Sequence, residues 1–162
     1  KLTPTSITSQ LLDNSIKKHL SDLLDNKIKF KVIGDTSHLP ENIKTTIQHA
    51  ETVTSKFSKY KLNIAYNYGG QWDIVNSINT LLNKKLVISH ENLSRHLSTG
   101  SDFPDLIVRT GGYKRLSNFM LWQAAYSELI FLDTLWPEFS PQDVSNILDN
   151  YKSIKRKFGK VD

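Results

Sequence analysis

The protein chain has 162 residues, of which 38% are hydrophobic and 23% charged, and its formal net charge is +5 at pH 7. This composition excludes a disordered chain and is typical of a folded domain with a core, and no apolar run approaches the ~20 residues that a membrane-spanning helix requires. The sequence has no cysteine, which excludes disulfides and thiolate metal ligands and accords with a cytoplasmic location.

Helical and extended hydrophobic patterns alternate along the chain. We expect helices over residues 5–26, within 37–58, over 74–82, over 91–97 and from Ser140 onward, and strands over residues 28–33, 62–66, 106–108 and 128–131. Such alternation predicts an α/β fold with a mainly parallel open sheet flanked by helices. Because no repeat, low-complexity run or linker interrupts the pattern, we expect residues 1–162 to form a single domain.

The stretch from Asp105 to Glu128 has the character of an anion site. A strand at 106–108 leads into a loop with two glycines, two arginines and a lysine, and a helix is predicted to open at Ser117 or Asn118. The first turn of such a helix has N–H groups without intrahelical partners, which attract anions.

Five loop residues of this stretch are suited to holding a phosphate. Arg109 leaves the end of the strand, and Gly111 and Gly112 let the backbone approach a ligand. Ser117 can cap the predicted helix or give its hydroxyl to the ligand, and Arg115 can complete a bidentate grip. Taken singly, the arginines also fit solvated loop charges and Ser117 a plain helix cap.

Glycine pairs follow two of the predicted strands, at 69–70 and at 111–112. In a parallel sheet the carboxyl ends of the strands bind ligands, so the pairs indicate a ligand edge, with tight turns as the alternative. The histidines at 38, 49, 90 and 96 lack metal-ligand spacing and are interpreted as surface or capping residues.

The pattern Arg-x-x-Gly-x-x-Arg-x-Ser-Asn-Phe-x-x-Trp-Gln-x-x-Tyr-x-Glu, from Arg109 to Glu128, resembles the signature of the cis-prenyltransferases of the undecaprenyl diphosphate synthase type. Residues 63–74 are similar to that family's Asn-Tyr-Gly-Gly-Arg segment. Residues 32–35, 135–139 and 157–159 match further family segments in the same order, so the resemblance spans nearly the whole chain.

The resemblance implies an α/β enzyme of isoprenoid biosynthesis that acts as a homodimer formed through its C-terminal part. It would condense isopentenyl diphosphate onto farnesyl diphosphate with Mg²⁺, making the undecaprenyl diphosphate that serves as a cell wall lipid carrier. Arg109, Arg115 and Ser117 match the isopentenyl diphosphate site, and Glu128 matches a carboxylate that helps hold magnesium. The helix at 5–26 would wall the tunnel for the growing lipid.

The family's Asp-Gly-Asn-x-Arg loop, with its catalytic aspartate, has no match here, and the chain begins at a predicted helix without an initiator Met. We therefore expect that aspartate upstream of this chain. Asn118, Trp122 and Asp73 are interpreted as structural: the first two shape and pack the motif, and Asp73 is a first-turn helix acid.

Three residues depart from the family pattern: Gln71 and Lys157 stand where arginine is usual, and Tyr113 where glutamate is frequent. Lysine lacks the planar fork of the arginine that reaches across the dimer, and whether Lys157 or Arg156 makes that contact stays open. Product chain length stays open as well.

Two other classes of function remain. A non-catalytic partner subunit of the same fold would generally lack the two-arginine motif. A basic RNA- or phosphate-binding module would bind nucleic acid with a steep salt dependence, and we expect no nucleic-acid partner. Transient contact with the inner membrane surface is expected for an enzyme that makes a lipid product.

Overall fold

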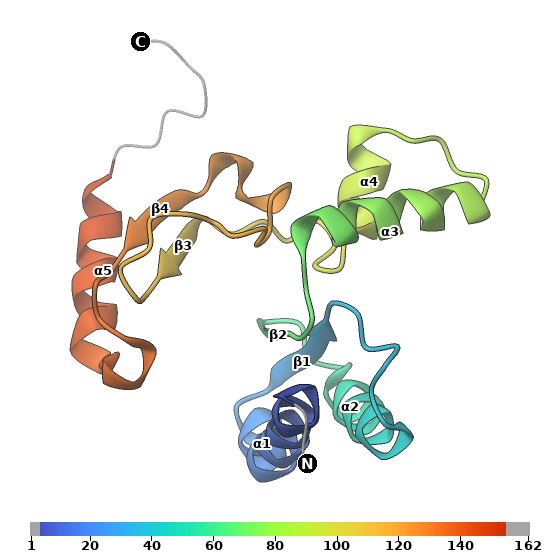
Figure 1. The fold of residues 1–162 in the computed structure, drawn as a ribbon, viewed down its shortest axis with the longest axis horizontal. Coiled ribbons are helices and arrows are strands. Elements are labelled where there is room, and N and C mark those ends of the chain that lie inside the picture. Colours follow the sequence, from blue (N-terminus) through green and yellow to red (C-terminus); the bar gives the residue numbers. More distant parts are fainter. Residues whose placement is uncertain (1–3, 155–162) are drawn as a thin grey trace. The chain divides into compact units, whose positions relative to one another are not determined.

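The computed structural model describes residues 4–154, with side chains from residue 7, and the chain divides into two compact units, Lys1–Tyr68 and Gly69–Asp162 (Figure 1). Each unit contains one pair of parallel strands with helices beside it. The α/β class with parallel strand pairing and flanking helices is therefore confirmed. The single domain over residues 1–162 stays a prediction.

The first unit is built from α1 (Pro4–Asp25), β1 (Ile28–Ile33), α2 (Glu41–Thr54) and β2 (Tyr60–Ala65). The strands pair in parallel from Ile28↔Tyr60 to Ile33↔Ala65. Apolar side chains of both helices, of β1 and of the segment between β1 and α2 form its core: Ile16, Leu23, Phe30, Val32, Leu39, Ile43, Ile47 and Ala50. Burial of such side chains away from water is the main stabilising contribution to the unit.

Side chains of α2 satisfy backbone donors of β1. The N–H of Phe30 donates to Thr54 Oγ1 at 3.1 Å, and the N–H of Val32 donates to Glu51 Oε1 at 2.8 Å. A buried backbone donor without a partner is costly, so these bonds fix α2 along the strand.

The second unit is built from α3 (Gly70–Asn83), α4 (His90–His96), β3 (Leu106–Arg109), β4 (Glu128–Phe131) and α5 (Pro141–Ser153). Two short 3₁₀ helices, Gln123–Tyr126 and Trp136–Glu138, flank β4 in the sequence. β3 and β4 pair in parallel from Leu106↔Glu128 to Arg109↔Phe131.

A buried carboxylate ties α3 to the segments that precede β3 and β4. Asp73, only 1% exposed, accepts hydrogen bonds from Ser98 N at 2.9 Å, from Ser98 Oγ at 2.7 Å and from Gln123 Nε2 at 3.0 Å. The sequence placed Asp73 correctly in a first helical turn, but not in this network, because its partners lie 25 and 50 residues away.

The sequence predicted most elements within a few residues. The strands at 28–33 and 128–131 are confirmed, and α5 begins as predicted, because Ser140 and Asp143 form a reciprocal capping box. The helix predicted to open at Ser117 or Asn118 is wrong: residues 117–122 form turns, followed only by the short 3₁₀ helix. Across the described part of the chain, no helix combines the length and apolarity needed to cross a membrane.

Candidate functional site

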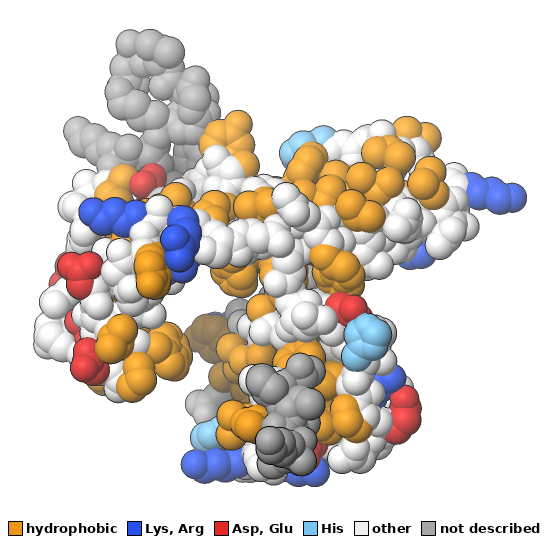
Figure 2. All heavy atoms as spheres, viewed as in Figure 1, with side chains coloured by type: hydrophobic (Ala, Val, Ile, Leu, Met, Phe, Trp, Pro, Cys, Tyr) orange, Lys and Arg blue, Asp and Glu red, His pale blue; other side chains and the backbone are white. Residues whose placement is uncertain are grey.

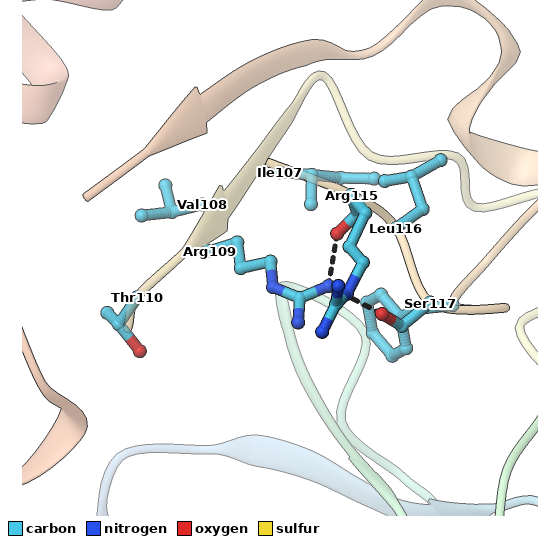
Figure 3. A pocket seen from close by; sticks show the side chains of 8 residues that line it. Ile107, Val108, Arg109, Thr110, Arg115, Leu116 and Ser117 are labelled. Carbon is cyan, nitrogen blue, oxygen red and sulfur yellow. Dashed lines mark hydrogen bonds between the residues drawn. The ribbon is translucent and has the colours of Figure 1, made fainter. Parts of the chain in front are cut away.

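The end of β3 and the loop after it line an open cavity of about 340 Å³ in the second unit (Figure 3). Its lining residues are Ile107, Val108, Arg109, Thr110, Arg115, Leu116, Ser117 and Phe119. Of the five residues that the sequence singled out for phosphate binding, Gly111 and Gly112 do not line this cavity, whereas Arg109, Arg115 and Ser117 do. Their convergence was predicted from the spacing of the motif.

Arg109 holds the loop in its folded form. Its Nη1 donates to the carbonyl oxygen of Arg115 and, at 2.8 Å, to Ser117 Oγ, as the dashed lines in Figure 3 show. A guanidinium has five N–H donors, of which Nη1 supplies two. Nε and Nη2 make no hydrogen bond within residues 4–154, so they remain for an anion.

Tyr113 contacts both arginines. The guanidinium carbon of Arg115 lies 4.3 Å from the centroid of its ring, and that of Arg109 lies 5.7 Å away. Within the described residues neither guanidinium has a carboxylate at ion-pair distance. Two cations without a counter-charge at one cavity favour a ligand that carries several negative charges.

Left-handed backbone shapes the loop at its far end. Ser117, Asn118 and Met120 have φ values of 49°, 63° and 47°, which no α-helix accommodates. Ser117 is therefore not a helix cap; its hydroxyl accepts from Arg109 instead. The predicted contribution of a helix N-terminus at this position to anion binding is absent.

Asn118 joins this loop to the beginning of α3. Its carbonyl oxygen accepts from Gly70 N at 2.6 Å, and its Oδ1 accepts from Gln71 N at 2.9 Å. A Cβ on Gly70 would lie 2.9 Å from the backbone nitrogen of Leu121, so only glycine permits this approach. The glycine pair at 69–70 thus serves packing between two motif segments.

The second glycine pair extends the β3–β4 pairing beyond the strands. Gly111 N donates to Thr134 O and Gly112 N donates to Leu132 O, both at 2.9 Å. Their φ values of 89° and 79° belong to the left-handed region. Both N–H groups are therefore occupied in this structure, and neither glycine lines the cavity beside Arg109. That the pair lets the backbone approach a ligand stays a prediction.

Glu128 stands apart from the arginine cavity. It begins β4 opposite Leu106, three positions along the strand pair from Arg109, which corresponds to about 10 Å. It does not line the cavity. Among residues 4–154, no group of three or more His, Cys, Asp or Glu side chains has an arrangement that could hold a metal ion.

Trp122 packs the motif, as the sequence indicated. Its Nε1 donates to Ser94 Oγ at 3.1 Å and its ring lies 5.2 Å from that of His90, which begins α4. Lys157 and Arg156, the candidates for a contact across a dimer, lie outside the described residues.

A second cavity, of about 350 Å³, lies in the first unit between α1 and the β1–β2 pair. Its lining is almost wholly apolar and comprises Leu11, Leu12, Ser15, Ile16, His19, Leu23, Phe30, Leu62 and Ile64. A cavity with such a lining suits a hydrocarbon chain rather than a charged ligand.

Comparison with known proteins identifies the family. Residues 5–159 match the prenyltransferase family model for undecaprenyl diphosphate synthase. The chain is 43% identical over 153 residues to an isoprenyl transferase of Chlamydia pneumoniae, covering 90% of this chain and 61% of that protein. It is 44% identical over 156 residues to the farnesyl-diphosphate-specific ditrans,polycis-undecaprenyl-diphosphate synthase of Buchnera aphidicola from Acyrthosiphon pisum, covering 91% of this chain and 61% of that protein.

Solved structures agree with the sequence comparison. A probable undecaprenyl diphosphate synthase of Campylobacter jejuni matches with a TM-score of 0.85 and 32% identity, over 93% of this chain and 72% of that one. Lavandulyl diphosphate synthase of Lavandula x intermedia, in complex with dimethylallyl diphosphate, matches with a TM-score of 0.87 and 28% identity, over 98% of this chain and 73% of that one. Sequence and structure thus agree over nearly the whole chain. The chain spans 61% of the length of each of the two curated relatives. It belongs to the cis-prenyltransferase family of the undecaprenyl diphosphate synthases.

Proposed function

We propose that this chain forms the isopentenyl diphosphate site and part of the lipid site of a prenyltransferase. The observation that carries the proposal is the convergence of Arg109, Arg115 and Ser117 at one cavity without a neighbouring carboxylate. The relatives named above support the substrate class, since one is described as specific for farnesyl diphosphate.

The reaction is a head-to-tail condensation. The bond between the allylic carbon of farnesyl diphosphate and its diphosphate oxygen breaks, and the double bond of isopentenyl diphosphate attacks that carbon. Loss of a proton leaves a new cis double bond, and pyrophosphate is released. Free guanidinium N–H groups of Arg109 and Arg115 hold the diphosphate of the attacking substrate, because charge-assisted bonds to oxyanions are strong and directional.

The apolar cavity of the first unit takes the hydrocarbon. Its nine lining residues include a single ionisable side chain, His19. A dry apolar wall excludes water from a reaction that develops allylic cation character. We propose repeated condensation to a long-chain, undecaprenyl product, with the chain length set by the volume of the complete tunnel.

We also propose a requirement for a divalent metal, magnesium, with Glu128 as one ligand. Magnesium is commonly held by one or two carboxylates together with substrate phosphates, and it would neutralise the leaving diphosphate. Among the described residues no group of three or more His, Cys, Asp or Glu side chains could hold a metal ion, so Glu128 is not part of a complete metal site there. Phosphate oxygens of the substrates would supply further ligands.

Exposed hydrophobic side chains support a partner surface on the second unit. They gather over α3, α4 and the segment between them (Figure 2), where Leu82, Leu86, Val87 and Ile88 are 57%, 42%, 75% and 52% exposed. Contiguous apolar patches of this kind mark interaction sites. We propose a cytoplasmic homodimer that touches the inner membrane surface transiently; sedimentation velocity and co-sedimentation with anionic vesicles test the two contacts separately.

The decisive experiment measures pyrophosphate release by the full-length protein with farnesyl and isopentenyl diphosphates. We expect EDTA to abolish turnover and magnesium to restore it. We expect turnover to fall by about 10²-fold or more in Arg115→Ala, because the variant loses a positioned charge contact worth about 3 kcal/mol. Lys114→Ala, the neighbouring cation outside the cavity, is the matched control. Absence of turnover from a folded wild-type protein would favour a non-catalytic partner subunit.

A further inference from the structure

We propose that Tyr113 is a positioning residue that holds the guanidinium of Arg115 in place for the diphosphate, an inference that rests on the proposed function. The side chains of the two arginines are held differently. Arg109 is fixed by hydrogen bonds to the Arg115 carbonyl and to Ser117, whereas the side chain of Arg115 makes no hydrogen bond within residues 4–154.

The ring of Tyr113 is what restrains Arg115. Its centroid lies 4.3 Å from the guanidinium carbon, well inside the range of about 6 Å over which a cation is attracted to an aromatic face. The Arg109 guanidinium, at 5.7 Å, lies near the limit of that range. One ring therefore orders a charged side chain that would otherwise sample many rotamers.

An aromatic ring can restrain an arginine without neutralising its positive charge. A carboxylate at the same position would pair with the guanidinium groups and would have to be displaced by the incoming diphosphate. The quadrupole of a tyrosine ring attracts both cations and leaves their positive charge and their N–H donors for the ligand. The cavity thus keeps its full charge in the free protein.

The exposure of Tyr113 accords with a role at the site rather than in the core. The residue is 57% exposed, and its ring buries little apolar surface. Its contribution to folding is correspondingly small, so substitutions should change diphosphate binding and leave stability nearly unchanged. Pre-organisation of Arg115 predicts an effect on affinity, because an unrestrained arginine must lose its freedom when the ligand binds.

The test compares Tyr113→Leu, which keeps apolar bulk without a π face, with Tyr113→Phe, which keeps the ring. Tyr60→Ala is the control, since Tyr60 is 54% exposed and its ring lies 5.0 Å from Lys59 Nζ, outside the arginine loop. Pyrophosphate release by the full-length protein gives KM for each substrate and kcat, and calorimetric titration with inorganic pyrophosphate gives a Kd that does not depend on turnover.

We expect Tyr113→Leu to raise KM for isopentenyl diphosphate and Kd for pyrophosphate by about 3- to 10-fold. KM for farnesyl diphosphate and kcat should stay within about twofold of wild type, and Tyr113→Phe should behave as wild type. Equal affinities in Tyr113→Leu and wild type, or an equal loss in Tyr113→Phe, would overturn the role of the ring.

The two readouts separate this inference from the proposed function. If the wild-type protein shows no turnover, the prenyltransferase proposal fails. A higher Kd for pyrophosphate in Tyr113→Leu than in the wild-type protein still supports the role of Tyr113. If the wild-type protein does not bind pyrophosphate at all, the role of Tyr113 is overturned as well. Matching thermal unfolding curves for the variants ensure that a change in Kd reports binding rather than misfolding.

Discussion

Replacement of Asn118 by alanine removes the side chain that holds the arginine loop on the first turn of α3. Asn118 Oδ1 accepts from Gln71 N at 2.9 Å, across 47 positions of sequence, while its carbonyl accepts from Gly70 N. The side chain acts as an N-cap supplied from a distant segment. The substitution also places a Cβ-bearing residue without a polar side chain at a φ of 63°.

These two effects give the expected magnitude. Loss of a cap acceptor costs about 1 kcal/mol, and alanine in the left-handed region costs about 1–2 kcal/mol more. We therefore expect Asn118→Ala to lower the free energy of unfolding by about 2–3 kcal/mol. Asn118→Gly tolerates the backbone and loses only the cap, so it should cost about 1 kcal/mol, and Asn118→Asp keeps the acceptor and should cost least.

Tryptophan fluorescence during urea unfolding measures this effect in the relevant unit. Trp72, Trp122 and Trp136 are the three tryptophans of the chain, and all belong to Gly69–Asp162. A shift in midpoint at constant m reports a change in stability alone. A loss below about 0.5 kcal/mol for Asn118→Ala, or an equal loss for Asn118→Gly, would refute this reasoning.

Two further predictions concern the cores of the two units. Because Leu81 is 0% exposed, Leu81→Ala should lower the free energy of unfolding by about 2–5 kcal/mol in the same fluorescence assay. Leu82 is 57% exposed, so Leu82→Ala should lower it by less than about 0.5 kcal/mol. Similar losses of stability for the two variants would contradict the burial pattern of α3. The hydrogen bond from Lys17 Nζ, at 2.6 Å, holds the pKa of Asp13 below its ordinary value of 3.8. Because the folded-state pKa is the lower one, the stabilisation is present above the ordinary pKa and is lost as the pH falls through the folded-state value. Asp13→Asn should therefore weaken the fall in stability between about pH 7 and about pH 3, measured by far-ultraviolet circular dichroism, and an unchanged pH dependence would exclude this role.

The local sequence pattern was sufficient for elements that depend on neighbouring residues alone, such as a capping box within one helical turn or a short run of strand-forming residues. The strands Ile28–Ile33 and Glu128–Phe131 follow from apolar and β-branched runs, and the start of α5 follows from Ser140 and Asp143, which lie within one turn. The cis-prenyltransferase resemblance came from motif spacing, which predicted a shared anion site for Arg109, Arg115 and Ser117, and all three line one cavity.

Local pattern failed where distant segments decide the backbone. The residues after Ser117 have helical spacing, yet Ser117, Asn118 and Met120 have left-handed φ values that break a helix, and Asn118 bonds to Gly70 and Gln71 instead. Periodicity reports which face is apolar, but it carries no information about a partner 47 residues away.

The sequence by itself indicated the order of the strands, the order of the helices apart from the one wrongly expected at residue 117, the family and the identity of the charged residues. Only the tertiary structure decided what those residues do before a ligand arrives: Arg109 holds the loop, Tyr113 restrains Arg115, and the glycine N–H groups at 111–112 bond to residues 132–134. The physical reason is that charge and periodicity are local properties of a chain. Hydrogen-bond partners and ring contacts depend on the folded path of the backbone, even within one loop. The loop that carries Arg109 and Ser117 is bonded to α3 through Asn118, whose partner Gln71 lies 47 positions away.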